Sequence, residues 1–126
     1  MKFAKWAFWA AGAWGVLVLT PLFFIFDIIG RQDPPAITHP GFYYGFVTAA
    51  LAWQAAFLVI GANPARFRPL MIPSVLEKFG YAAAVITLHL QGRMRASDVP
   101  LGVMDLFLGI LFLAAFAKTK NAEQSS

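Results

Sequence analysis

The sequence predicts an all-α, polytopic membrane protein in which four transmembrane helices form an antiparallel bundle. Of its 126 residues, 60% are hydrophobic and only 13% are charged, whereas about 25% are charged in an average protein. A chain this small leaves much of its surface exposed, so we expect lipid rather than water to cover that surface. The apolar residues also form blocks of transmembrane length, and prolines lie between these blocks.

Four apolar blocks are each long enough to cross a bilayer, because a hydrocarbon core of about 30 Å requires roughly 20 helical residues. Their predicted spans are 6–30, 42–62, 72–92 and 99–117, which make one transmembrane domain over 1–117 and leave a polar, frayed tail at 118–126. The apolar runs are continuous rather than alternating, which favours helices over the strands of a barrel.

The first block contains one ionisable residue, Asp27, and an internal proline, Pro21. A proline inside a helix removes a backbone hydrogen bond, so we expect a kink there. The block is about 25 residues long, which exceeds the roughly 7 to 15 apolar residues of a signal-peptide core. It is therefore interpreted as an uncleaved span.

The remaining blocks each follow a segment rich in helix-breaking residues. Asp33-Pro34-Pro35 and His39-Pro40-Gly41 precede the second block, and Asn63-Pro64 closes it. Pro69 and Pro73 frame the start of the third, where proline is tolerated. Ser97-Asp98-Val99-Pro100 is typical of an N-cap and first helical turn before the fourth.

Lysine and arginine residues are divided unevenly between the two sides of the predicted bundle. The N-terminus, the middle loop and the C-terminal tail carry Lys2, Lys5, Arg66, Arg68, Lys118 and Lys120, whereas the other two loops carry Arg31, Arg93 and Arg95. Because cytoplasmic loops hold the excess of basic residues, both termini are expected in the cytoplasm. No organelle signal is visible, which favours the inner (plasma) membrane of a bacterium.

A first polar layer is predicted near the cytoplasmic face. Gln54, Glu77 and Lys78 lie roughly 8 to 10 Å inside their spans at about 1.5 Å per residue, and Arg66 and Arg68 lie in the intervening loop. Sequence neighbours are about 100° apart on a helix, so Glu77 and Lys78 are not expected to pair with each other. Glu77 is expected to pair with Arg66 or Arg68 instead. Lys78 is expected to extend toward lipid headgroups. The layer is interpreted as a structural ion pair, with anionic-headgroup binding by the three basic residues or proton relay as alternatives.

A second polar layer is predicted near the outer face, where Asp27, His89 and Asp105 lie at similar depths. Asp105 shares a helix face with Gly102 and Gly109, so it is expected to face the interior beside His89 or Asp27. Hydrogen bonds that join helices are one interpretation. A proton or ligand site is the other, because imidazole titrates near neutral pH.

Several classes of chemistry have no support in the sequence. The chain contains no cysteine, which excludes disulfides, thiolate metal sites and cysteine nucleophiles. No P-loop, dinucleotide-binding turn, Ser-His-Asp set or zincin helix is present, and no metal or cofactor is expected. The basic residues lie between apolar blocks rather than in one stripe, so nucleic acid is not expected.

The hydropathy of the whole chain resembles that of the small bacterial DoxX-like membrane proteins. The shared features are four short spans with both ends inside, a proline within the first helix, and an aspartate early in the last span, in Pro100-Leu-Gly-Val-Met-Asp105-Leu-Phe-Leu. The resemblance implies a four-helix architecture and almost no mechanism.

Three functions are compatible with these features. We expect foremost an accessory or scaffold protein, or a small subunit of a larger membrane complex, because no catalytic set is visible. An oligomeric protein that binds or transports a small amphiphile, quinone or proton is the first alternative. A membrane enzyme that uses Asp105 or Glu77 as its acid or base is the second. Membrane lipids, other membrane subunits or further copies of this chain are the expected partners.

Overall fold

The computed structural model describes residues 2–32, 38–94 and 98–120, and every regular element in these ranges is a helix. The all-α prediction is confirmed for this part of the chain. The predicted turn Asp33-Pro34-Pro35, the loop residue Arg95, the capping residue Ser97 and the tail from residue 121 lie outside the described residues.

The first predicted span is divided into three helical pieces. Helix α1 covers Lys2–Leu19, a 3₁₀ turn η1 covers Thr20–Phe23, and a short helix α2 covers Phe26–Gln32. The proline of the first block lies at the start of the 3₁₀ turn, where its missing N–H and its ring end the α-helical hydrogen-bond ladder. The single span 6–30, kinked at its proline, is thus a helix that begins earlier and stops before that proline.

The other three spans appear as single long helices close to their predicted bounds. Helix α3 covers Pro40–Ala62, η2 covers Arg68–Leu70, α4 covers Met71–Leu90, and α5 covers Val99–Lys118. His39 and Asp98 occupy the N-cap positions of α3 and α5, each followed by a proline in the first turn. Proline fits there because the first backbone N–H groups of a helix have no intrahelical partner.

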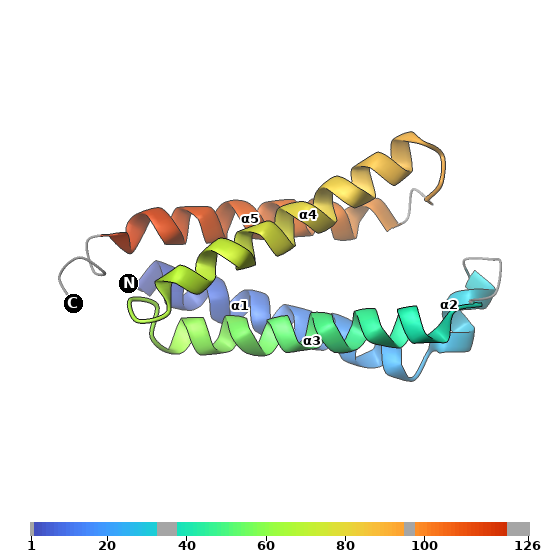
Figure 1. Ribbon diagram of the computed structural model, residues 1–126, viewed down its shortest axis with the longest axis horizontal. Helices are drawn as coiled ribbons and strands as arrows, with labels where there is room; N and C mark the ends of the chain where they lie inside the picture. Colours follow the sequence, from blue (N-terminus) through green and yellow to red (C-terminus); the bar gives the residue numbers. More distant parts are fainter. Residues whose placement is uncertain (1, 33–37, 95–97, 121–126) are drawn as a thin grey trace.

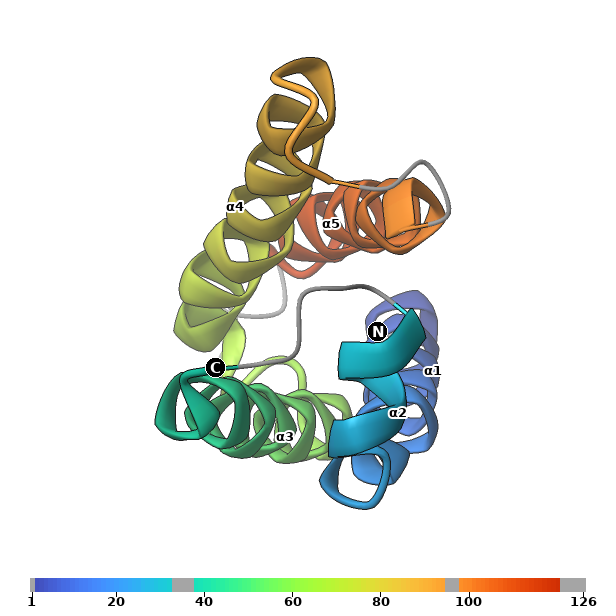
Figure 2. The same cartoon turned by 90° about the vertical axis from the view of Figure 1, so that its right-hand side faces the viewer.

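The long helices associate as two pairs, the α1–α3 pair and the α4–α5 pair. Figure 1 shows the two helices of each pair side by side, and Figure 2, which looks along the length of the molecule, shows the α4–α5 pair above the α1–α3 pair. Within the first pair, Trp9 Nε1 donates to the carbonyl of Leu58 at 3.0 Å, and Tyr43 Oη donates to the carbonyl of Leu22 at 2.6 Å. The beginning of α1 therefore lies beside the end of α3.

The two pairs pack tightly at one end and separate toward the other. Between the pairs, α1 contacts α5 over more residues than α3 contacts α4, and α4 diverges from α3 toward the right of Figure 1. At the tightly packed end, the Phe8 and Phe112 rings stack at 4.0 Å between centroids, and Phe57 meets Phe112 edge-on at 4.9 Å. All three side chains are completely buried, so this aromatic cluster joins the two pairs.

The outer surface of the bundle is strongly apolar. Large hydrophobic side chains are exposed along all four long helices, including Leu17, Phe42, Leu76 and Phe107. Within the described ranges, four helical stretches are long and apolar enough to cross a membrane: Lys2–Phe23, Pro40–Ala62, Arg68–Leu90 and Val99–Lys118. This part of the sequence prediction is confirmed.

Candidate functional site: a charged cavity between the helix pairs

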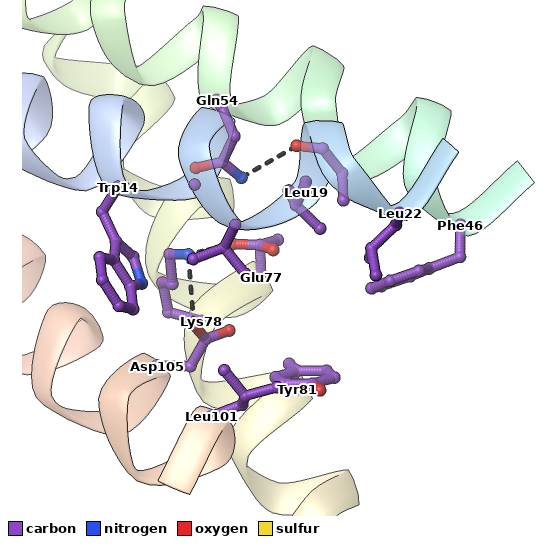
Figure 3. A pocket seen from close by; sticks show the side chains of 13 residues that line it. Trp14, Leu19, Leu22, Phe46, Gln54, Glu77, Lys78, Tyr81, Leu101 and Asp105 are labelled. Carbon is purple, nitrogen blue, oxygen red and sulfur yellow. Dashed lines mark hydrogen bonds and ion pairs between the residues drawn. The ribbon is translucent and has the colours of Figure 1, made fainter. Parts of the chain in front are cut away.

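A cavity of about 200 Å³ lies between the two helix pairs. Its wall is mostly apolar and carries a small group of polar side chains, which Figure 3 shows pointing toward one another. The lining residues are Trp14, Gly15, Val18, Leu19 and Leu22 of the first segment, Phe46, Ala50 and Gln54 of α3, Glu77, Lys78 and Tyr81 of α4, and Leu101 and Asp105 of α5. All four long helices therefore contribute to one site.

Three charged side chains meet in this cavity, and we call Glu77, Lys78 and Asp105 the charged triad. Lys78 Nζ lies 3.5 Å from Asp105 Oδ1 and 3.6 Å from Glu77 Oε2. Only 4% of Lys78 is exposed, and its ammonium group also lies 5.1 Å from the centroid of the Phe57 ring. The lysine is thus enclosed between two carboxylates and an aromatic ring.

This arrangement corrects two predictions about α4. Lys78 does not extend toward lipid headgroups, and Glu77 and Lys78 do interact. Although neighbours are about 100° apart on a helix, the long stem of lysine can bend back toward the adjacent carboxylate. Asp105 on α5 provides a second carboxylate in the same direction, so the interior position is favoured over the lipid surface.

Arg66 and Arg68 are not the partners of Glu77. Arg68 is 9% exposed and points to the end of α5, where Nε and Nη2 donate to the carbonyl of Phe116 at 3.0 and 2.8 Å. Arg66 is exposed in the loop, with its guanidinium 5.4 Å from the Phe67 ring. The three basic residues predicted to bind an anionic headgroup, Arg66, Arg68 and Lys78, therefore do not form one site. Arg68 and Lys78 are buried at separate places.

The predicted outer layer does not form either. Asp105 faces the interior as expected, but its partner is Lys78 rather than His89 or Asp27. Asp27 on α2 and His89 near the end of α4 are exposed and line no part of the cavity. Depth counted along each helix placed Asp105 and Lys78 in different layers. In the structure Lys78 lies beside Gly109, four residues from Asp105 on α5, and its long side chain reaches the aspartate.

Gln54 reaches the same cavity because α1 has a glycine opposite it. A Cβ atom at Gly15 would overlap the Gln54 side-chain amide, so only glycine leaves room for it. Gln54 Nε2 donates to the carbonyl of Ala50 at 2.9 Å, while Oε1 is buried without a hydrogen-bond partner. Glu77 Oε2 is also buried without a hydrogen bond, but it is in an ion pair with Lys78. The free Gln54 oxygen is the exception, since buried polar atoms normally have partners in folded proteins.

Sequence reasoning missed the aromatic members of the site and one residue of the tail. Trp14 and Tyr81 line the cavity, but both lie among many aromatic residues and carry no local signal. Thr119, assigned to the frayed tail, is fully buried, and it accepts a hydrogen bond from Arg68 Nε at 3.1 Å. Thr119 was placed in the tail because it lies in a run of polar residues.

Among the described residues, no group of three or more His, Asp or Glu side chains is arranged to hold a metal ion. Comparison with known protein families, with curated proteins and with solved structures finds no match for this chain. The DoxX-like resemblance therefore stays a prediction, and any function must be argued from the cavity.

Proposed function

We propose that this chain is a multi-pass membrane protein, an antiparallel bundle with both termini in the cytoplasm of a bacterium, whose internal cavity binds a small amphiphile taken from the lipid phase. The observation that carries this proposal is the charged triad inside a largely apolar cavity. An apolar wall suits the hydrophobic part of such a ligand, and the triad suits its polar part.

Stability alone does not account for these charges. Ionisable side chains inside a membrane are costly and are typical of ligand, ion or proton pathways. A buried ion pair is often replaced by apolar residues of similar volume without loss of stability. The buried, unpartnered oxygen of Gln54 adds to this cost, which favours a site that a ligand completes.

Access from the lipid phase is supported by the side chains at the edge of the cavity. Trp14, Phe46 and Leu101 line it and are each 42–48% exposed. Because they contribute to both the cavity wall and the apolar outer surface, the cavity is open laterally. An amphiphile dissolved in the bilayer can enter there without crossing water.

Mass spectrometry of gently solubilised protein tests this function. We expect a small molecule to copurify with the wild type and to be lost from Ala50→Phe, whose added ring would fill the cavity. Ala49→Phe is the matched control, because Ala49 is exposed on the same helix and does not line the cavity.

Two results would contradict the proposal. One is a wild-type preparation without any bound small molecule, and the other is a molecule retained equally by both variants. Stoichiometric larger subunits without a ligand would favour the accessory or scaffold function instead.

A further inference from the structure

We infer that the cavity selects amphiphiles with a cationic head group, such as a primary ammonium, over neutral or anionic ones. This inference rests on the proposed function and names the chemical class of its ligand. It is carried by the charge of the cavity, the hydrogen-bonding groups left open in it, and its aromatic wall.

The charge of the cavity lining favours a cation. The lining side chains that carry a formal charge near pH 7 are two carboxylates, Glu77 and Asp105, and one ammonium, Lys78. With all three ionised, the formal charge of the lining is −1. Lys78 lies 3.5 and 3.6 Å from the two carboxylates, so it is already engaged and leaves one negative charge without a counter-ion among the lining residues.

The open hydrogen-bonding groups point the same way. Gln54 is 2% exposed, its amide N–H₂ group is directed to the carbonyl of Ala50, and its Oε1 has no partner. Glu77 Oε2 is buried without a hydrogen bond and is held only by its ion pair with Lys78 at 3.6 Å. Both oxygens are acceptors, so they favour a ligand that donates hydrogen bonds, and a primary ammonium supplies three N–H donors.

Aromatic side chains complete a site for a cation with an apolar tail. Trp14 and Tyr81 line the cavity from opposite helix pairs, and cations are attracted to the faces of such rings. Leu19, Leu22 and Leu101 provide apolar wall beyond the polar group. The head group is therefore placed near the triad and the tail toward the lateral opening.

Calorimetric titration of the detergent-solubilised full chain with hexylamine, hexan-1-ol and hexanoate at pH 7 tests this selectivity. The three probes share one tail and differ in charge, and titration into empty micelles corrects for partitioning. We expect hexylammonium to bind at least tenfold more tightly than hexanoate, with hexan-1-ol between them.

Variants locate the selectivity within the cavity. Glu77→Gln and Asp105→Asn each remove one negative charge at nearly constant shape, so each should reduce the preference for hexylammonium over hexan-1-ol at least fivefold. Asp27→Asn removes an exposed carboxylate outside the cavity and should leave the preference unchanged. This ratio compares two probes on the same variant, so partial unfolding does not alter it.

The outcomes separate this inference from the proposed function. Equal affinity for all three probes, or tightest binding of hexanoate, would overturn the cation selectivity while a binding cavity remains. An unchanged preference in both cavity variants would also overturn it. If no probe binds and no small molecule copurifies, the proposed function itself fails.

Discussion

At the scale of single residues, the environment of Lys78 determines the charge balance inside the bundle. Its ammonium group lies between Glu77 and Asp105, and the aromatic ring of Phe57 covers it on another side. Removing the lysine would leave two carboxylates close together without a counter-ion. Removing either acid would leave the lysine paired with the other, so the two kinds of substitution are not equivalent.

We therefore predict that Lys78→Met destabilises the protein by about 3 kcal/mol, since breaking a buried ion pair costs roughly 3–5 kcal/mol and the two carboxylates are partly exposed. Unfolding followed by circular dichroism in mixed micelles measures this change. Lys120→Met, at an exposed lysine, is the control. The double variant Lys78→Met/Asp105→Asn should lose less than the sum of the single losses, and strict additivity would argue against the pairing.

Sequence reasoning identified the polar residues of the cavity but not their partners. Gln54, Glu77, Lys78 and Asp105 were singled out because polar groups inside a span are costly. Their pairing depends on how α4 is rotated against α5 and on the reach of the Lys78 side chain from beside Gly109 to Asp105. Neither is encoded in a count of residues from the helix end. For the same reason His89 and Asp27, at a similar nominal depth to Asp105, lie on the surface instead.

At the scale of helices, close approach depends on residues without side chains. A Cβ atom at Gly102 of α5 would lie 2.7 Å from Val85 Cβ on α4, whereas at Gly80 of α4 it would meet nothing within 4 Å. Gly102 thus permits contact between the two helices of the α4–α5 pair. Gly80 is exposed and contributes only the flexibility of glycine.

Gly102→Ala should destabilise the protein by about 1–3 kcal/mol, the usual cost of overpacking. The added Cβ would meet the Cβ of the buried Val85, which cannot move away unless the backbone of α4 moves. The same substitution at Gly80 should be neutral or stabilise by up to about 1 kcal/mol, since alanine is the better helix former. Thermal unfolding of the two variants in one detergent compares them. Equal effects at both positions would contradict the close packing of α4 and α5.

Helix boundaries followed from the sequence where a local signal exists. His39-Pro40 and Asp98-Val99-Pro100 marked the starts of α3 and α5 because capping and first-turn preferences act within a few residues. The end of α1 was placed too late, although Pro21 was visible. The sequence stays apolar on both sides of Pro21. An apolar run indicates that a segment lies in lipid, but it does not show that the backbone hydrogen bonds of the helix are unbroken.

At the scale of the whole molecule, Arg68 links the segment between the two pairs to the end of α5. Its guanidinium donates to the Phe116 carbonyl and to Thr119 Oγ1, and it stacks 3.7 Å from the centroid of the Phe116 ring. The last carbonyls of a helix lack intrahelical partners, so this contact caps α5. It fixes the end of α5 beside the start of α4.

Arg68→Ala should therefore increase hydrogen exchange of the backbone amides of residues 115–119 and reduce stability by about 2 kcal/mol, within the range for hydrogen bonds to charged groups. Arg66→Ala is a matched control, because this neighbouring arginine is exposed. Hydrogen exchange read by mass spectrometry distinguishes the two. A similar increase at the end of α5 in both variants would show that loop charge, not this contact, protects the helix.

The fold also gathers the basic residues at one end of the molecule. Lys118 Nζ lies 4.4 Å from the Phe3 ring centroid, which places the end of α5 beside the start of α1, and Arg68 brings the middle loop to the same end. The six basic residues assigned to the cytoplasmic side, Lys2, Lys5, Arg66, Arg68, Lys118 and Lys120, therefore belong to segments that meet there (Figure 1). Arg31 lies in the last turn of α2 and Arg93 follows the end of α4, and both of these helix ends lie at the opposite end of the molecule (Figure 1).

Because basic residues favour the cytoplasmic side, fusions after Lys120 in a bacterial host should give a fluorescent green fluorescent protein and an inactive alkaline phosphatase. Fusions after Arg93, in the loop at the opposite end, should give the reverse. The two positions control for expression, since each reporter is silent at one site and active at the other. An active phosphatase after Lys120 together with a dark fluorescent fusion would show the opposite orientation. The tightly packed end that contains Arg68 would then lie on the non-cytoplasmic side of the membrane.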